Sequence, residues 1–312
     1  MIVFPHHQNS YPSKLSIRLN SKTAYQHSLN SFEQENIFAQ SWWLDATAGE
    51  KNWTAFFAEN KFSFAAHQKN KLLQKALLPS VLTPYQPVVK FDATLVNELN
   101  HFSFVELFWR NFEKKWLMEF EKNDWKISFK HTRQLELDDI EKLYNNFKPS
   151  LKRQIQKAEN ALKVSVNEDL QTLHAVSSET FTRQKKQIPC TFEQLKTVDE
   201  ACKKHHARKY FIAYNTDAKP CAAIYLVYDK NCCYYILGGI SIEFKNSGAM
   251  CLLLWQAIQF AKTESKHFDF CGSTITSIDK FFSTFGAQKI EVLVLNKYAN
   301  SLQEWAIRKW KK

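Results

Sequence analysis

The stretch KNSGAMCLLLWQAIQFAKTESKHFDFCGS, residues 245–273, joins a loop of small residues, a long apolar run and a compact ending. The apolar run predicts a helix, and HFDFCGS predicts a short strand that ends in a turn. Glycine is scarce in this chain, with six residues in total, of which five lie between residues 238 and 286. Because glycine lets a ligand or a packed element approach the backbone closely, this region is where we look for a site.

The loop before the helix has the composition of an anion site. Three strand-like segments end at Gly238 and Gly239, and the small-residue loop follows within ten residues. A helix start carries free N–H groups and a partial positive charge, and small residues there let phosphate reach the backbone. The residues expected to bind a coenzyme pyrophosphate are Gly238, Gly239, Lys245, Asn246, Ser247, Gly248 and Ala249. The alternative is that Asn246 or Ser247 only caps the helix while Gly248 packs closely on a strand.

Length and composition limit the class of protein. At 312 residues, two domains are expected, and 45% hydrophobic residues can fill substantial cores. The net charge of +11 indicates an anionic partner, without choosing between nucleic acid, a coenzyme and an acidic surface. The longest apolar run, Ala249–Ala261, is too short for a transmembrane helix. Seven cysteines without a paired CxxC indicate buried thiols in a cytoplasmic protein without a metal site.

Both halves of the chain show helices followed by antiparallel strands. We therefore predict an α/β (α+β) fold of two tandem units, each a mostly antiparallel mixed sheet flanked by helices. The expected boundaries are a flexible tail over 1–35, a first domain over 36–140 and a second domain over 141–312 that carries the donor site. Within the first domain, the proline-punctuated stretch 72–90 is expected to be irregular.

The order of several motifs resembles a known family. From Lys148 onward, the chain reads KPSLKRQIQKAENALKVSV, ETFTRQ, AAIYLVYDKNCCYYILGG, the 245–273 stretch and IDKFFSTFGAQ. This order is similar to the carboxy-terminal half of the FemAB-like branch of the GNAT acyltransferase superfamily, and the resemblance extends over roughly residues 37 to 300. It implies two GNAT folds in tandem and an acyltransferase.

The resemblance also suggests roles for single residues. It places Lys152, Arg153 and Arg183 where they would face an anionic donor or acceptor, although each could be a solvated helix residue. Asp269, between two phenylalanines in a strand, could be a general base with a raised pKa, or it could cap the following turn. Tyr298 follows the last predicted strand, roughly where GNAT enzymes carry a general-acid tyrosine.

The expected function is transfer of an acyl group from acetyl-CoA or another acyl-CoA to an amine acceptor, such as an amino sugar or amino acid derivative. Positioning and oxyanion stabilisation can carry this chemistry without a visible triad. The chain departs from the family in retaining only KNSGA of the glycine-rich pyrophosphate signature. Two alternatives therefore stay open, namely a transferase that uses aminoacyl-tRNA and a cell-wall precursor, and a degenerate GNAT module that binds a ligand without turnover.

Overall fold

The computed structural model describes residues 22–310 except 59–60, 72–73, 166–168 and 273–274. Its strands are β1 (Trp53–Ala58), β2 (Phe62–Lys71), β3 (Gln74–Leu78), β4 (Val88–Val89), β5 (Phe104–Trp109), β6 (Lys126–Glu136), β7 (Lys163–Ser165), β8 (Arg208–Tyr214), β9 (Pro220–Tyr228), β10 (Cys232–Ile240), β11 (His267–Asp269) and β12 (Gln288–Tyr298). They form one mixed sheet in the order β1-β2-β3-β5-β12-β6-β11-β10-β9-β8-β7, with β4 paired to β2. The predicted α/β fold class is confirmed.

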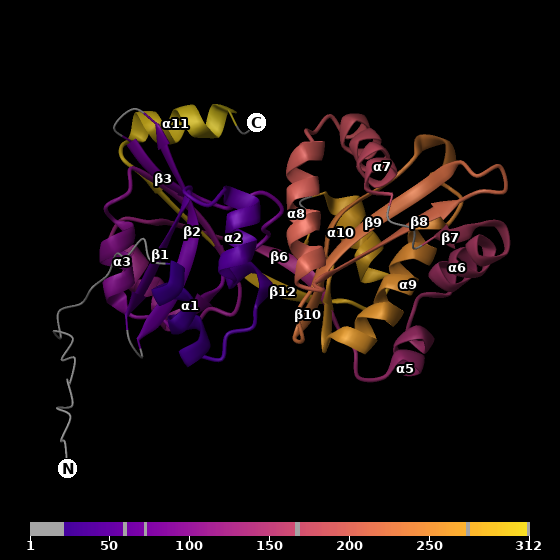
Figure 1. The fold of residues 1–312 in the computed structure, drawn as a ribbon, viewed down its shortest axis with the longest axis horizontal. Coiled ribbons are helices and arrows are strands. Elements are labelled where there is room, and N and C mark those ends of the chain that lie inside the picture. Colours follow the sequence, from indigo (N-terminus) through magenta and orange to yellow (C-terminus); the bar gives the residue numbers. More distant parts are fainter. Residues whose placement is uncertain (1–21, 59–60, 72–73, 166–168, 273–274, 311–312) are drawn as a thin grey trace, which may run out of the picture.

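Helices cover both halves of this sheet (Figure 1). The α-helices are α1 (Lys22–Ser31), α2 (Ser41–Ala48), α3 (Ala93–Leu99), α4 (Leu117–Glu121), α5 (Ile140–Asn145), α6 (Pro149–Ala161), α7 (Leu170–Arg183), α8 (Phe192–Lys204), α9 (Ala249–Glu264), α10 (Thr276–Ser283) and α11 (Ser301–Trp310). Short 3-10 helices are η1 (Ile37–Ala39), η2 (Lys114–Trp116) and η3 (Ile242–Phe244). No helix in the described part of the chain has the length and hydrophobicity of a bilayer-spanning segment.

Strand β9 shows why the second half is built in three layers. Its sequence PCAAIYLVY is apolar on both faces, as expected for a strand that is covered on both sides. Ala222, Ile224 and Leu226 face a core formed with α6 and α9. The alternate residues Ala223 and Tyr225, together with Val227, face a second core formed with α7 and α8.

The two halves share packed residues instead of meeting across solvent. The core under α7 and α8 includes Phe38, Trp43 and Tyr85 from the first half of the chain. In addition, the ring of Trp42 on α2 stacks on His205 after α8, with ring centroids 4.3 Å apart. The orientation of one half relative to the other is therefore fixed by side-chain packing.

Two predicted domain boundaries and one predicted irregular stretch differ from the structure. Helix α1 lies within the expected tail, where Tyr25 and Leu29 are buried, so only residues 1–21 of that tail lie outside the described residues. Strand β12 comes from the expected second domain, but it pairs with β5 and β6 and buries Leu293 and Leu295 in the core of the first half. The stretch 72–90 also contributes two short strands, β3 and β4, to the sheet.

Candidate functional site

Strands β10 and β11 separate in the middle of the second half. They pair in parallel only over Cys232–Tyr234 and His267–Asp269, and β11 ends there. Strand β10 continues to Ile240 along β9, with a register shift between Tyr235 and Leu237. On the side of β10 that faces away from β9, no strand of the described residues pairs with β10 beyond Tyr234. The sheet therefore opens into a cleft at this point.

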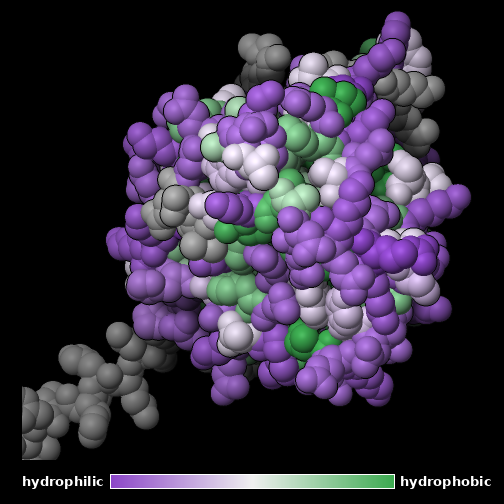
Figure 2. All heavy atoms as spheres, turned by 90° about the vertical axis from the view of Figure 1, so that its right-hand side faces the viewer, coloured by the Kyte–Doolittle hydropathy of each residue, from purple (hydrophilic) through white to green (hydrophobic). Residues whose placement is uncertain are grey.

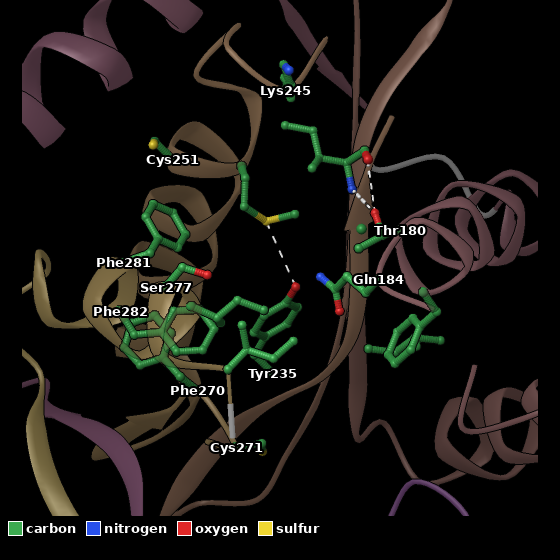
Figure 3. A pocket seen from close by; sticks show the side chains of 18 of the residues that line it. Thr180, Gln184, Tyr235, Lys245, Cys251, Phe270, Cys271, Ser277, Phe281 and Phe282 are labelled. Atoms are coloured by element: carbon green, nitrogen blue, oxygen red, sulfur yellow. Dashed lines mark hydrogen bonds between the residues drawn. The ribbon is translucent and has the colours of Figure 1, made fainter. Parts of the chain in front are cut away.

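The cleft holds a cavity of about 630 Å³, a size typical of small-molecule sites (Figure 3). Its interior is apolar. Phe270, Phe281 and Phe282 line one side, and the rings of Phe270 and Phe282 are stacked with centroids 4.6 Å apart. Across the cavity the Tyr235 hydroxyl lies 3.9 Å from the sulfur of Met250. Such an interior suits the apolar part of a ligand.

The charged residues of the cavity are all basic. Among the described lining residues Arg183, Lys186 and Lys245 are cationic and none is an aspartate or glutamate. Arg183 donates from Nη1 to the carbonyl oxygen of Ile240, at 3.1 Å, which holds the guanidinium at the edge of β10. The cavity therefore combines an apolar interior with a positive rim, and it favours an anionic ligand.

The start of α9 forms part of the same wall. Ser247 Oγ accepts the Ala249 N–H at 3.1 Å, so one of the first amides of the helix is capped. The amide of Met250, which lines the cavity, has no hydrogen-bond partner in the part of the chain that the structure describes, and the amide of Cys251 is directed at its own thiol. Free amides at a helix start attract negative charge.

Glycine at the start of α9 is required by packing. Gly248 has a φ of +82°, and a Cβ built there would lie 2.5 Å from the carbonyl oxygen of Gln154 on α6. Gly239 is similar, because its Cβ would lie 2.5 Å from the carbonyl oxygen of Val176 on α7. Gly248 thus packs closely, as the alternative interpretation predicted, but on a helix and not on a strand.

A second groove of about 440 Å³ meets the cavity at Ile236 and Cys271, which line both. Its other side is the proline-containing loop 79–84 of the first half, and Pro189 closes it. Nearby on β6, burial lowers the pKa of Lys130 to about 8, and its ammonium lies over the ring of Phe108. The two cavities are adjacent but have different walls, so two ligands could meet at Cys271.

Comparison with known proteins shows which family the second half of the chain resembles. Residues 145–277, which include α9 and most of the cavity lining, match the family model of the acetyltransferase (GNAT) domain. Within residues 145–277 the chain is thus similar to an acetyltransferase of the GNAT type. No curated protein sequence matches it.

Solved structures extend the similarity to the whole fold. FemX is 11% identical with a TM-score of 0.65, over 86% of this chain and 95% of FemX. The C-terminal domain of a lysylphosphatidylglycerol synthetase from Agrobacterium fabrum, described as putative, is 11% identical with a TM-score of 0.57, over 90% and 94% of the two chains. A tandem GNAT protein from the clavulanic acid biosynthesis pathway is 9% identical with a TM-score of 0.50, over 91% and 98%. The resemblance to FemAB-like tandem GNAT folds is confirmed.

The structure brings together about half of the residues that we predicted for the GNAT site. Gly238, Gly239, Lys245, Gly248 and Arg183 all line the cavity. Ser247, Asn246 and Ala249 do not, and Ala249 is buried in the core. Their binding roles through side chains therefore lose support, and a binding role for the loop stays a prediction.

The basic pair on α6 lies elsewhere. Lys152 donates from Nζ to the carbonyl oxygen of Asn145 at 2.9 Å and lies over the ring of Tyr144, and neither Lys152 nor Arg153 lines the cavity. Gln154, the next residue along the helix, does line it, and its side chain accepts from the thiol of Cys251 at 3.3 Å. Helical periodicity turns the cationic positions away from the GNAT cavity.

Asp269 is fully buried at the end of β11. It pairs with Arg110 at 2.6 Å and accepts from the Thr132 hydroxyl, from the Cys271 amide and, at 3.3 Å, from the Tyr85 hydroxyl. Burial raises the pKa of the Asp269 carboxyl, and Arg110 is the main opposing influence. The Cys271 contact is the turn cap that we considered as an alternative. A role as general base stays a prediction.

Tyr298 does not reach this site. It ends β12 in the first half, opposite Phe104, and the two rings are stacked with centroids 5.4 Å apart. Gln288, at the other end of β12, pairs with Gln134, which also pairs with Asp269. Ten residues of strand, about 33 Å at ~3.3 Å per residue, therefore separate Tyr298 from the GNAT cavity.

The aromatic wall was missed in the sequence. Phe281 and Phe282 belong to the motif IDKFFSTFGAQ, to which we assigned no binding role, and they line the cavity from α10. We expected no metal, and the described residues contain no cluster of histidine, cysteine and acidic side chains suited to one.

Helix α10, which carries this wall, is held by an ion pair that we expect to be sensitive to acid. Asp279 accepts from Arg133 Nε at 2.7 Å and Nη2 at 2.9 Å, and these bonds hold the pKa of its carboxyl well below the usual range. A lowered pKa stabilises the fold above the unfolded value of about 3.9, and this stabilisation is lost as pH falls below it. Asp279→Asn should cost about 1–3 kcal/mol at pH 7 in urea unfolding, and the difference should shrink below pH ~4. A difference that stays constant down to pH 3 would contradict the assignment.

Proposed function

We propose that the chain is an N-acyltransferase whose donor is an acyl-coenzyme A and whose acceptor is a small amine. The observation that carries this proposal is the cavity between the separated strands β10 and β11, with an apolar interior and a rim of three cations. An acyl-pantetheine arm is mostly apolar, whereas the phosphates at the other end of coenzyme A are anionic. The interior of the cavity would hold the acyl-pantetheine arm, and its cationic rim would hold the phosphates.

The proposed phosphate end lies at the start of α9. There the free amide of Met250 and the cations Lys245 and Arg183 belong to residues that line the same cavity. Amides at a helix start favour phosphate without a glycine-rich loop, which explains how a reduced KNSGA segment can still serve. The residues present therefore fit an acyl-coenzyme A donor.

The proposed acceptor enters through the second groove, between loop 79–84 and Cys271. The amine nitrogen attacks the thioester carbonyl, an amide bond forms, and the carbon–sulfur bond breaks to release the coenzyme thiol. One proton passes from the amine to a base and then to the leaving sulfur. Lys130, with a pKa near 8, and Asp269 are the candidates for that base.

A titration of the purified, nucleic-acid-free protein with acetyl-CoA and longer acyl-CoA thioesters tests the donor. We expect binding with negative heat-capacity change, and we expect Arg183→Ala and Lys245→Ala each to weaken it about 3- to 10-fold. Because both residues lie at the rim, the losses should diminish at high salt. Lys196→Ala, which removes an exposed cation on α8 outside the cavity, is the matched control and should bind as the wild type does.

Aminoacyl-tRNA is the second candidate donor. The net charge of +11 and the fold shared with a protein named for lysylphosphatidylglycerol synthesis favour it. Charged tRNA should then bind with a steep salt dependence, and acyl-CoA should give no heat with either the wild type or the rim variants.

Binding of acyl-CoA without product from a broad amine panel would instead indicate a module that binds without turnover.

A further inference from the structure

Helix α11 lies at the outer end of the first half (Figure 1). Apolar side chains of this helix are exposed to solvent. Leu302 is 72% exposed and Trp305 is 60% exposed, and Ala306 between them on the helix surface is exposed as well. The polar Gln303 and Glu304 are only half-exposed, on the side toward the protein. A surface helix normally has the opposite arrangement, so this face is suited to a partner.

The orientation of α11 is fixed at its start. The Asn300 side chain accepts the Gln303 N–H at 2.9 Å, and the Gln303 side chain accepts the Ala299 N–H at 2.7 Å. These reciprocal bonds cap the helix directly after β12, the strand against which it packs. The outward position of Leu302 and Trp305 is therefore set by the fold.

The composition of this segment indicates which partner could cover the face. The sequence of residues 299–312 contains four lysine or arginine residues and one glutamate, in a chain of net charge +11. Lys309 lies with its Nζ 5.1 Å from the centre of the Trp305 ring, so a cation borders the apolar face directly. Leucine and tryptophan beside lysine are the residues with which an interfacial helix enters the boundary of an anionic bilayer.

We propose that α11 docks the protein reversibly on an anionic lipid surface, with Leu302 and Trp305 inserted among the acyl chains and Lys309 at the headgroups. A second copy of the chain is a poorer occupant. A two-fold contact through this face would place the Lys309 ammonium close to its own copy. The donor cavity lies in the other half, along α9 and α10, and a docked α11 leaves it open.

Vesicle co-sedimentation tests this proposal, with phosphatidylcholine vesicles and with vesicles that contain 30% phosphatidylglycerol. We expect the wild type to bind only the anionic vesicles, and more weakly as salt increases. Leu302→Glu/Trp305→Glu should reduce binding by at least about tenfold, because it removes the inserted side chains. Met118→Glu, which changes an apolar side chain of 56% exposure on α4, is the matched control and should retain binding.

Several results would overturn the proposal. These are no binding of the wild type to anionic vesicles at low salt, equal binding by the double variant, and equal loss in Met118→Glu. A dimer in sedimentation equilibrium that the double variant dissociates would assign the face to a second copy. Since all substituted side chains are exposed, each variant should unfold at the wild-type temperature. Acyl-CoA titration should be unchanged in all of them, so failure here is distinct from failure of the proposed donor.

Discussion

Met250→Trp is expected to weaken acyl-CoA binding at least about 100-fold, because the larger side chain would fill the cavity between β10 and β11. Met250 lies in the first turn of α9, half-buried, with its sulfur 3.9 Å from the Tyr235 hydroxyl across the cavity. An indole at this position would occupy the space proposed for the pantetheine arm and would also cover the free Met250 amide at the helix start. Isothermal titration calorimetry with acetyl-CoA measures the effect.

Gln259→Trp is the control for that variant. It introduces the same side chain on the same helix, at an exposed position outside the cavity, and it should bind as the wild type does. Extra volume at Met250 can cost about 1–3 kcal/mol of stability, so thermal unfolding of both variants should be compared first. If folded Met250→Trp binds within a few-fold of the wild type, the donor does not occupy this cavity. Gly248→Trp is a poorer test, since it would push directly on the backbone of α6.

Local patterns predicted most elements of the fold, but not where the last strand pairs. The alternation in 289–297 indicates a strand with one buried face, and it says nothing about which neighbours cover that face. The structure places Leu293 and Leu295 between β5 and β6, in the core of the first half. Helix α1 was missed for a related reason. Its sequence is mostly polar, and only burial of Tyr25 and Leu29 against β1 and β2 makes it part of the fold.

The site was predictable where it depends on one continuous segment. Gly238, Gly239, Lys245 and Gly248 line one cavity because strand, loop and helix follow directly in the chain, and their binding role stays a prediction. Tyr298 and Asp269 depended on long-range pairing. The partner of Asp269, Arg110, lies 159 residues earlier, and no local pattern connects the two. The rim cation Lys186 was missed because it lies in the exposed segment just after α7, where a solvated lysine is ordinary.

Asp269→Asn is expected to separate the two interpretations of the fully buried Asp269 carboxylate at the end of β11. The variant keeps the size of the side chain but removes the charge that pairs with Arg110, whose side chain is 13% exposed. Breaking a buried pair in this way typically costs about 3–5 kcal/mol, which corresponds to a decrease in Tm of roughly 5–8 °C for a chain of this length. Differential scanning calorimetry measures that decrease.

Catalysis supplies the second readout. If Asp269 mainly joins the two halves through Arg110, thiol release from acyl-CoA in Asp269→Asn should stay within about tenfold of wild type at temperatures where the variant is folded. A general base should instead lose about 10²- to 10⁴-fold in kcat. Arg110→Met is the matched variant, because it breaks the same pair and leaves the carboxyl in place. Equal loss of stability with retained kcat in both variants would assign Asp269 to the structure and leave Lys130 as the proton acceptor to test next.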